Sequence, residues 1–542
     1  MTIGEKIYIL RTKARLSQES LAAKLDVTRQ SISKWELNEA TPGLSKIPLL
    51  SEIFDIDIKL LISEDYELEA PADAINDSVE YNNKYFGTDG YRGEANVQLT
   101  SLNAYKVGRF LGWFYSKNLP DNRRAKIVIG KDTRLSSYML EYSLIAGIVA
   151  SGTDVYMLHV TTTPSVSYVT RMDGFDAGVM ITASHNPYYD NGIKVINRYG
   201  EKLDDKTASL IESYIDGDIE RLIAGATDLP YAVKDKIGKI VDYSQGRNRY
   251  IGYLISIATH SFKNLKIGID TANGASFSIA KSVFEALGAQ VYVTGCEPNG
   301  TNINLGVGST HIENLSEFVK ENHLDLGFAF DGDADRCLAV DERGNVVDGD
   351  KIMYILAMRL KEMDNLDHNT VVATIMSNSG LIKAFKKQGI ECVQTQVGDR
   401  FVYEKMQECD YKLGGEQSGH IILKKYATTG DGILTAIMLA EQVCDKKTNI
   451  STLCRDVVLF PQITKNVRVF SKEEVMQDKD ILNRVEDITA RIGDNGRILL
   501  RKSGTEPVIR IMAECETVDI CNGYINELYK LIESKGYING EY

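Results

Sequence analysis

The chain has 542 residues, of which 43% are hydrophobic and 25% charged, and its formal net charge is −13. This length exceeds what one hydrophobic core usually supports, so we expect several domains. No stretch approaches the roughly 18 apolar residues of a membrane span, and the first residues lack the apolar segment of a secretory signal. The composition therefore excludes a membrane-spanning protein, predicts a cytoplasmic one, and argues against a protein that coats nucleic acid.

Residues 3–64 are predicted to form short helices, because apolar residues recur there at spacings of three and four. Thr28 stands at the N-cap of a helix that follows the tight connection "LDV", which is typical of a helix-turn-helix. The stretch "LSQESLAAKLDVTRQSISKWELNEATP" resembles the lambda-repressor and Cro-like DNA-binding domains. The resemblance implies that the third helix faces the major groove with four side chains, Arg29, Gln30, Ser33 and Lys34.

DNA binding is not the only role open to this N-terminal segment. It holds nine basic and nine acidic residues, whereas contacts of basic residues with phosphates supply much of the affinity of DNA-binding domains. A helical docking or dimerisation module fits the same pattern. The next segment, residues 65–82, holds six acids and no base, and is predicted to be a solvated linker.

From residue 83 the pattern changes to strand, polar turn and helix. Residues 125–137, 265–287 and 370–385 each place an apolar strand before a turn rich in small polar residues. The fold class predicted is α/β: an all-α helix-turn-helix domain, three repeated α/β domains and a smaller C-terminal α+β domain. The predicted boundaries are 1–64, a linker at 65–82, then 83–242, 243–345, 346–458 and 459–542.

Ser184 follows an apolar run in "VMITASHNPYYDNGIK", and Lys194 lies ten residues further on. An acyl-transfer serine would need a G-x-S-x-G elbow, which this stretch lacks, so a hydrolase is disfavoured. A serine beside Asn-Pro can also make only local backbone hydrogen bonds. Taken alone, this stretch leaves the role of Ser184 open.

The stretch "LGFAFDGDADRCLAV" places Asp331, Asp333 and Asp335 at alternate positions between two apolar strands. Three hard oxygen ligands at this spacing can converge on one divalent cation. A calcium-binding EF-hand is excluded, because the sixth loop position is Arg336 instead of glycine and the flanks are strands. An oxygen of a phosphorylated serine would suit the next ligand position.

Two further stretches contain groups that suit a sugar phosphate. "RKSGTEPVIR", residues 501–510, combines arginines, hydroxyls and a glycine that can bind phosphate oxygens. "GGEQSGH", residues 414–420, sets mixed donors and acceptors in a glycine-rich loop that suits sugar hydroxyls. Read singly, each could also be an ordinary surface turn.

Together the motifs resemble one family, the α-D-phosphohexomutases, from about residue 84 to the C-terminus. The matching motifs, in the family's order, are "FGTDGYRG" (86–93), "TASHNP" (182–187), "DGDADR" (331–336), "GEQSGH" (415–420) and "SGTEPVIR" (503–510). Within the family, "GCEPNGTNIN" and "QVGDR" are most similar to the bacterial phosphoglucosamine mutases, although that group more often has serine at the position of Thr182. The resemblance implies interconversion of glucosamine 6-phosphate and glucosamine 1-phosphate through a phosphoserine enzyme and a 1,6-bisphosphate.

The resemblance also implies roles for individual residues. Ser184 would carry the phosphoryl group and, with the three aspartates, bind Mg²⁺, while glucosamine 1,6-bisphosphate would act as primer. Lys194 and Arg92 would orient the reacting hydroxyl and assist proton movement. The residues implied in binding substrate are Arg336, Glu416, Ser418, His420, Arg501, Ser503, Gly504, Thr505 and Arg510.

Two alternatives stay open. A phosphomannomutase or phosphoglucomutase is compatible with the same motifs, because "GEQSGH" does not show how an amino group would be recognised. A DNA-binding regulator that senses a sugar phosphate is also compatible, although a sensor has no need of Ser184 and three aspartates. The sequence leaves the oligomeric state open, a homodimer included.

Overall fold

The computed structural model describes residues 3–13, 16, 18–25, 27–36, 40–43, 46–54, 56, 58–63, 83–87, 89–117, 119, 123–493, 496–502 and 508–539. The predicted linker at 65–82 lies outside the described residues. The chain divides into two compact units, Met1–Asn82 and Asn83–Tyr542. None of the helices described is long and apolar enough to cross a membrane.

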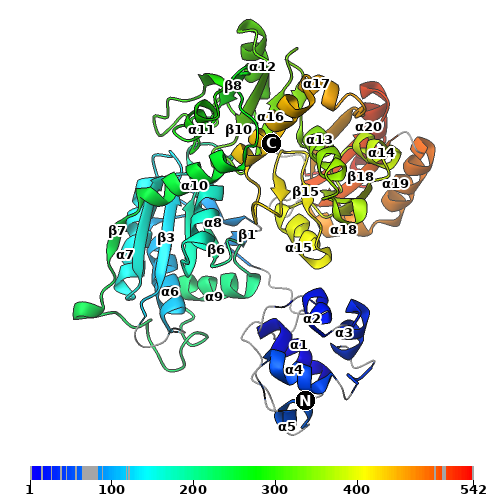
Figure 1. Cartoon of the computed structure of the whole chain (residues 1–542). Coiled ribbons are helices and arrows are strands. Elements are labelled where there is room, and N and C mark those ends of the chain that lie inside the picture. Colours follow the sequence, from blue (N-terminus) through cyan, green and yellow to red (C-terminus); the bar gives the residue numbers. More distant parts are fainter. Residues whose placement is uncertain are drawn as a thin grey trace. The chain divides into compact units, whose positions relative to one another are not determined.

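The N-terminal unit consists of short helices (Figure 1). They are α1 (Ile3–Lys13), α2 (Gln18–Leu25), α3 (Arg29–Glu36), α4 (Ile47–Phe54) and α5 (Ile58–Ile62). Thr28 caps α3 as predicted, since its hydroxyl accepts the Ser31 N–H at 3.2 Å. Ile7, Leu21, Ile32 and Trp35 join one buried core. The predicted helix-turn-helix domain is confirmed.

The second unit begins with a seven-stranded sheet of order β1-β2-β6-β5-β3-β4-β7. Its strands are β1 (Phe86–Gly87), β2 (Gly90–Glu94), β3 (Lys126–Lys131), β4 (Asp154–Val160), β5 (Ala177–Ile181), β6 (Asp190–Asn197) and β7 (Ile240–Asp242). The helices of this part are α6 (Ser101–Lys117), α7 (Ser137–Ala150), α8 (Thr163–Met172), α9 (Asp205–Asp216) and α10 (Ser244–Ile257). Strands β5, β3, β4 and β7 are parallel, so the loops after them meet at one edge of the sheet.

Two further sheets follow, of orders β12-β11-β10-β8-β9 and β14-β13-β15-β16. The five-stranded sheet contains β8 (Lys266–Asp270), β9 (Gln290–Thr294), β10 (Leu326–Phe330), β11 (Cys337–Val340) and β12 (Val346–Val347), with α11 (Ala280–Ala286) and α12 (Ile312–Glu321). The four-stranded sheet contains β13 (Thr370–Thr374), β14 (Glu391–Thr395), β15 (Leu413–Gly415) and β16 (Ile421–Leu423), with α13 (Gly349–Glu362), α14 (Ser379–Lys387), α15 (Asp399–Cys409), α16 (Gly432–Lys446) and α17 (Ile450–Leu453).

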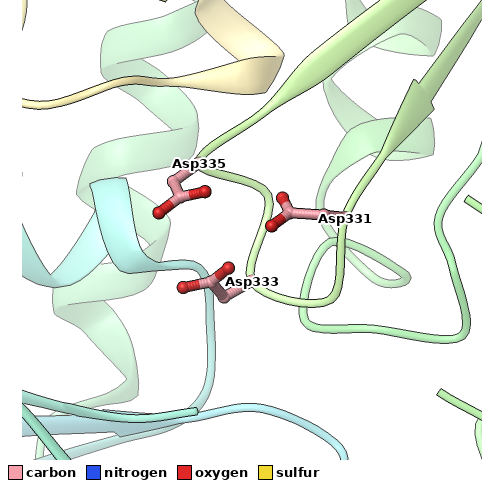
Figure 2. A group of neighbouring side chains, drawn as sticks. All are labelled: Asp331, Asp333 and Asp335. Carbon is pink, nitrogen blue, oxygen red and sulfur yellow. The ribbon is translucent and has the colours of Figure 1, made fainter. Parts of the chain in front are cut away.

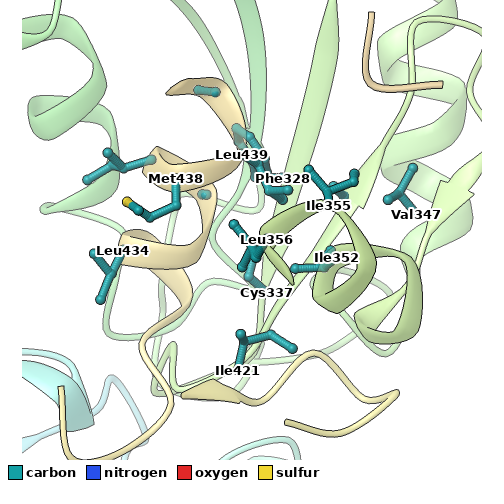
Figure 3. Close-up of a cluster of buried hydrophobic side chains, with 14 of the residues drawn as sticks. Phe328, Cys337, Val347, Ile352, Ile355, Leu356, Ile421, Leu434, Met438 and Leu439 are labelled. Carbon is teal, nitrogen blue, oxygen red and sulfur yellow. The ribbon is translucent and has the colours of Figure 1, made fainter. Parts of the chain in front are cut away.

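One hydrophobic core serves both of these sheets (Figure 3). Phe328 on β10 and Cys337 on β11 belong to the five-stranded sheet, whereas Leu356 on α13 and Leu439 on α16 follow the boundary predicted at residue 346. All four side chains are at most 1% exposed. Residues 331–336, the predicted metal loop, connect β10 to β11 and are therefore anchored in a core to which two sheets contribute.

The C-terminal part is a three-stranded antiparallel sheet of order β17-β19-β18 with helices. Its elements are β17 (Gln462–Arg468), α18 (Lys472–Gln477), α19 (Lys479–Ile492), β18 (Arg497–Lys502), β19 (Val508–Glu514) and α20 (Val518–Ser534). This confirms the predicted fold class, three α/β parts followed by a smaller α+β part.

Candidate active site

Ser184 lies in the connection between β5 and β6, beyond the carboxyl end of β5. Its side chain is buried, and its backbone adopts the left-handed region with a φ of 51°. Ser184 Oγ donates a hydrogen bond to Asp331 Oδ2 at 2.5 Å, across 147 residues of sequence. The Ser184 N–H donates to the Thr182 hydroxyl at 2.9 Å, a contact that a serine at position 182 could also make. The fold thus brings the predicted serine onto the predicted metal loop.

The loop between the antiparallel strands β10 and β11 carries the three aspartates (Figure 2). Asp331, Asp333 and Asp335 are buried, and each offers a carboxylate oxygen within 4.8 Å of those of the others. Asp333 Oδ1 and Asp335 Oδ1 have no hydrogen-bond partner among the described residues. Buried acceptors without donors are rare unless a ligand satisfies them. The cluster could hold a divalent cation, for which carboxylate oxygens are suitable ligands.

The three carboxylates differ in their electrostatic surroundings. Burial, and then the neighbouring Asp335 and Asp333, raise the pKa of Asp331 well above its ordinary value. Burial alone would also raise the pKa of Asp335, but Lys194 and His420 outweigh it and hold this pKa well below the ordinary value. Asp335 therefore keeps its negative charge even where no cation is bound.

Lys194 on β6 supplies a positive charge to this cluster. Its Nζ lies 2.8 Å from Asp333 Oδ2, 3.1 Å from Asp335 Oδ2 and 3.6 Å from Asp89 Oδ2. Burial would lower the pKa of Lys194, but Asp333, Asp335 and Asp89 raise it well above 10.5. The side chain therefore carries a positive charge and donates hydrogen bonds to Asp333 and Asp335.

The arginines predicted for the site lie beside these carboxylates. Arg92 on β2 is placed by the pairing of β2 with β6, opposite Gly192, and forms an ion pair with Asp89. Burial would lower the pKa of Arg336, but Asp331, Asp335 and Glu416 raise it. The Nε atoms of both arginines are buried and have no hydrogen-bond partner in the described part of the chain. Both can therefore donate to a bound anion.

The predicted sugar loop, Glu416 to His420, connects β15 to β16 and packs on the metal loop. The Cys337 N–H donates to the Gly419 carbonyl at 3.0 Å, and a side chain at Gly419 would clash with the Cys337 carbonyl. Ser418 Oγ is buried without a hydrogen-bond partner among described residues, while Glu416 accepts the Gly398 N–H at 3.0 Å. The loop therefore lies beside Arg336, and the Ser418 hydroxyl is available to bind a ligand.

His420 is occupied within the protein. Its Nε2 accepts the Gly430 N–H at 2.9 Å and lies 3.3 Å from Asp399 Oδ2. These contacts favour a role in holding the loop.

The predicted phosphate loop joins β18 to β19. Arg501 and Arg510 are directly opposite each other in the antiparallel pairing of these strands. Burial, together with the neighbouring Arg510, lowers the pKa of Arg501. Like charges opposite each other destabilise a sheet, and an anion between them removes that cost. The remaining predicted residues of this loop, Ser503, Gly504 and Thr505, lie outside the described residues.

Sequence reasoning missed a chain of charges that leads away from the cluster. Lys202 Nζ lies 2.6 Å from Asp89 Oδ1 and 2.6 Å from Asp399 Oδ2, and Asp399 in turn contacts His420. A cavity of about 480 Å³ is lined by Lys202, Asp399 and His420, among others. This volume lies within the range of pockets that hold small molecules. The motif "QVGDR", which contains Asp399, was the feature of the sequence that could have indicated these contacts.

Two more residues at the cluster were not among the site residues predicted from the sequence. Thr163, at the start of α8, donates its hydroxyl to Asp333 Oδ2 and its N–H to the Asp333 carbonyl. His185 Nδ1 lies 3.4 Å from Ser184 Oγ. Burial, and then Arg336 and Arg92, lower the pKa of His185 to about 4, so this ring is neutral at neutral pH. "TTTP" at the end of β4 was a signal for Thr163.

The predicted DNA contacts lie on α3 of the N-terminal unit. Lys34 is exposed, as a contact with DNA requires. The side chains of Arg29, Gln30 and Ser33 lie outside the described part of the structure, although the helix that carries them is described.

Family models match nearly the whole chain. The models for phosphoglucomutase/phosphomannomutase alpha/beta/alpha domains I, II and III match residues 83–221, 248–344 and 348–459, and the C-terminal domain model matches 465–531. A helix-turn-helix model matches residues 7–61.

Curated relatives and solved structures agree with these matches. Phosphoglucosamine mutase of Lachnospira eligens is 56% identical over 454 residues, covering 84% of this chain and 99% of the relative. The Bacillus subtilis phosphoglucosamine mutase is 47% identical over 453 residues, covering 83% and 99%.

Among solved structures, a phosphoglucomutase/phosphomannomutase family protein of Burkholderia thailandensis has a TM-score of 0.69 at 21% identity, covering 84% of this chain and 99% of that one. N-acetylphosphoglucosamine mutase of Aspergillus fumigatus, in complex with GlcNAc-6P and magnesium, has a TM-score of 0.58 at 14% identity, covering 84% and 96%. These two likenesses concern the fold. The family models and the identities to the curated relatives show that the chain, beyond an N-terminal helix-turn-helix domain, belongs to the phosphoglucomutase/phosphomannomutase family and, within it, to the phosphoglucosamine mutases.

Proposed function

We propose that this protein converts glucosamine 6-phosphate into glucosamine 1-phosphate by way of a phosphoserine and glucosamine 1,6-bisphosphate. The contact of Ser184 Oγ with Asp331 carries the proposal, because it joins a hydroxyl to a cluster of carboxylates that suits a divalent cation. Relatives named phosphoglucosamine mutase share about half of the residues over more than four fifths of the chain.

Phosphorylated Ser184 gives its phosphoryl group to the O1 hydroxyl of glucosamine 6-phosphate. The bond from Ser184 Oγ to phosphorus breaks, a bond from O1 to phosphorus forms, and the O1 proton passes to Ser184 Oγ, which becomes a hydroxyl again. The 1,6-bisphosphate then turns around. The bond from O6 to phosphorus breaks, a bond from Ser184 Oγ to phosphorus forms, and the Ser184 proton passes to O6, so that glucosamine 1-phosphate is released. A trace of the bisphosphate primes any unphosphorylated enzyme.

When Mg²⁺ is bound by Asp331, Asp333, Asp335 and the phosphoserine, it offsets negative charge on the transferred phosphoryl group. Lys194 holds Asp333 and Asp335 in place through its hydrogen bonds. Arg92 presents its guanidinium to the reacting end of the sugar.

One set of residues binds the sugar, and another set binds the phosphate group that does not react. The residues proposed to bind the sugar are Arg336, Glu416 and Ser418, with His420 holding their loop. Those proposed to bind the phosphate that does not react are Arg501, Ser503, Gly504, Thr505 and Arg510. Because these residues hold the phosphate that lies away from Ser184, either end of the sugar can face Ser184.

The test is turnover by the purified protein with Mg²⁺ and a trace of glucosamine 1,6-bisphosphate. Glucosamine 6-phosphate, glucose 6-phosphate and mannose 6-phosphate are compared side by side, and we expect the amino sugar to react fastest. Ser184→Ala should abolish turnover, whereas Ser143→Ala on α7, whose hydroxyl donates to the Met139 carbonyl of its own helix, should not. Faster turnover of glucose or mannose 6-phosphate would support the alternative mutases, and no turnover of any sugar would refute the proposal.

We also propose that the N-terminal unit binds DNA through the start of α3. The match to a helix-turn-helix model and the exposure of Lys34 support this second function. Binding of the full-length protein to a pool of genomic fragments at low salt should weaken with rising salt. Arg29→Ala and Lys34→Ala should weaken it further, with Lys59→Ala on α5 as the control. Absence of DNA binding at low salt would refute this function. A change in DNA affinity on adding glucosamine 6-phosphate would support the alternative of a DNA-binding regulator that senses a sugar phosphate.

A further inference from the structure

Arg134, in the turn between β3 and α7, is fully buried and donates mostly to main-chain carbonyls of residues 184–190, the serine loop. Its Nε donates to Asp132 Oδ2 at 2.8 Å, and its terminal nitrogens donate to the carbonyls of Ser184 at 2.9 Å and Asn186 at 2.8 Å. The same guanidinium also donates to the carbonyls of Pro187 and Asp190. One side chain therefore contacts four carbonyls of residues 184–190.

A second donor reaches the same loop from the part of the chain around the five-stranded sheet. Asn304 Nδ2 donates to the Ser184 carbonyl at 2.9 Å and to the Asn186 carbonyl at 3.1 Å. Arg134 and Asn304 thus share two acceptors, and each of these carbonyls has both lone pairs engaged. The Ser184–His185 and Asn186–Pro187 peptide groups are therefore each held by donors from two parts of the chain.

This double grip matters because the backbone of Ser184 is strained. A φ of 51° in the left-handed region costs a non-glycine residue about 1–2 kcal/mol. The hydrogen bonds from Arg134 and Asn304 offset this cost, because a change in the Ser184 backbone would leave its buried carbonyl without these donors. The metal loop also packs closely here, because a side chain at Gly332 would clash with the Ser184 carbonyl.

We propose that Arg134 is a positioning residue for phosphoryl transfer, acting with Asn304. Together they hold the carbonyls of Ser184 and Asn186, keep Ser184 in its left-handed conformation and so direct its Oγ at Asp331. This inference rests on the proposed mutase function. The substitution Arg134→Lys keeps the positive charge, but the new ammonium group cannot bond all four carbonyls, because it lacks the planar, forked geometry of a guanidinium.

The chain offers a matched control in Arg109 on α6. It is also fully buried and also donates to main-chain carbonyls, those of Leu229 and Pro230, but it is not bonded to the serine loop. Arg134→Lys should lower kcat about 100-fold with little change in KM, as expected for a displacement of about 1 Å at a reacting atom. Arg109→Lys should lower thermal stability while leaving kcat, per folded molecule, within about threefold of wild type.

Phosphorylation of Ser184 provides a second readout. The enzyme is incubated with glucosamine 1,6-bisphosphate, and the gain of phosphate is followed by intact mass. The rate should fall in Arg134→Lys and Asn304→Asp, whose carboxylate cannot donate, but not in Arg109→Lys. Combining Arg134→Lys with Asn304→Asp should cost less than the product of the single losses in kcat, because both act on the same two carbonyls.

An active wild type with kcat and phosphorylation rate unchanged in Arg134→Lys would overturn the inference alone. If Arg134→Lys does not fold, Asn304→Asp decides the matter by the same two measurements. A wild type that neither turns over nor becomes phosphorylated would instead overturn the proposed mutase function, and this inference with it.

Discussion

Replacing Lys194 by methionine tests the electrostatic account of the aspartate cluster. The substitution keeps a similar length and removes the ammonium that bonds Asp333 and Asp335 and lies 3.6 Å from Asp89. The side chain of Lys194 is only 5% exposed, so water cannot replace the lost charge. Buried carboxylates would then face one another without this cation.

Removing one partner of a buried ion pair costs about 3–5 kcal/mol. For large domains each kcal/mol changes the melting temperature by about 2–4 °C, so we expect Lys194→Met to melt about 6–20 °C below wild type in the presence of a chelator. A divalent cation in the cluster would restore a positive charge. Added Mg²⁺ should therefore stabilise Lys194→Met more than wild type.

The assay is thermal unfolding with a chelator and with Mg²⁺. Lys131→Met is the matched control, because Lys131, on β3 of the same sheet, forms a fully buried ion pair at 2.5 Å with Glu141 of α7. This control should lose a similar amount of stability and gain nothing extra from Mg²⁺. A loss below about 1 kcal/mol in Lys194→Met, or equal effects of Mg²⁺ on both variants, would refute the reasoning.

Three further predictions concern separate parts of the molecule. Asp333→Ala should remove most of the turnover and its dependence on Mg²⁺, and an unchanged Mg²⁺ titration would contradict the metal site. Arg501→Met should raise KM for glucosamine 6-phosphate about tenfold or more, because a charged hydrogen bond is worth about 1.5–3 kcal/mol, and an unchanged KM would contradict the distal-phosphate role. Burial raises the pKa of Asp350 from 3.8 to about 7, so the folded protein binds this proton more tightly than the unfolded chain. The resulting contribution to the free energy of unfolding is fully present below about pH 4 and declines by about 4 kcal/mol as the pH rises to about 7. Asp350→Asn should remove this decline when the free energy of unfolding is measured with denaturant at several pH values. The same pH dependence in Asp350→Asn and wild type would contradict the prediction.

The helices, strands and principal site motifs could be predicted from local pattern. Thr28 caps α3 where the sequence placed a helix start. Each predicted strand-turn-helix segment is realised, as β3 with α7, β8 with α11 and β13 with α14. Alternate aspartates in a turn between apolar strands also predicted a cluster whose oxygens converge. Such features depend on residues close in sequence, which is why pattern alone suffices.

Contacts between distant segments could not be predicted in this way. The core shared by the second and third sheets crosses a boundary that the strand pattern placed at residue 346. Lys202 contacts Asp89 and Asp399, which lie 113 and 197 residues away. No periodicity or motif spacing pairs charges at such separations, because their contacts arise only when sheets pack.

The sequence by itself determined the fold class, the order of the domains and the residue types of the site, because hydrophobic period, caps and motif spacing are local properties of the chain. Only the tertiary structure decided how those residues act on one another. It set Ser184 against Asp331, gave Lys194 its charge among buried carboxylates, and placed Arg134 and Asn304 on the same two carbonyls. Burial makes these pairings strong, and burial is a property of the packed molecule.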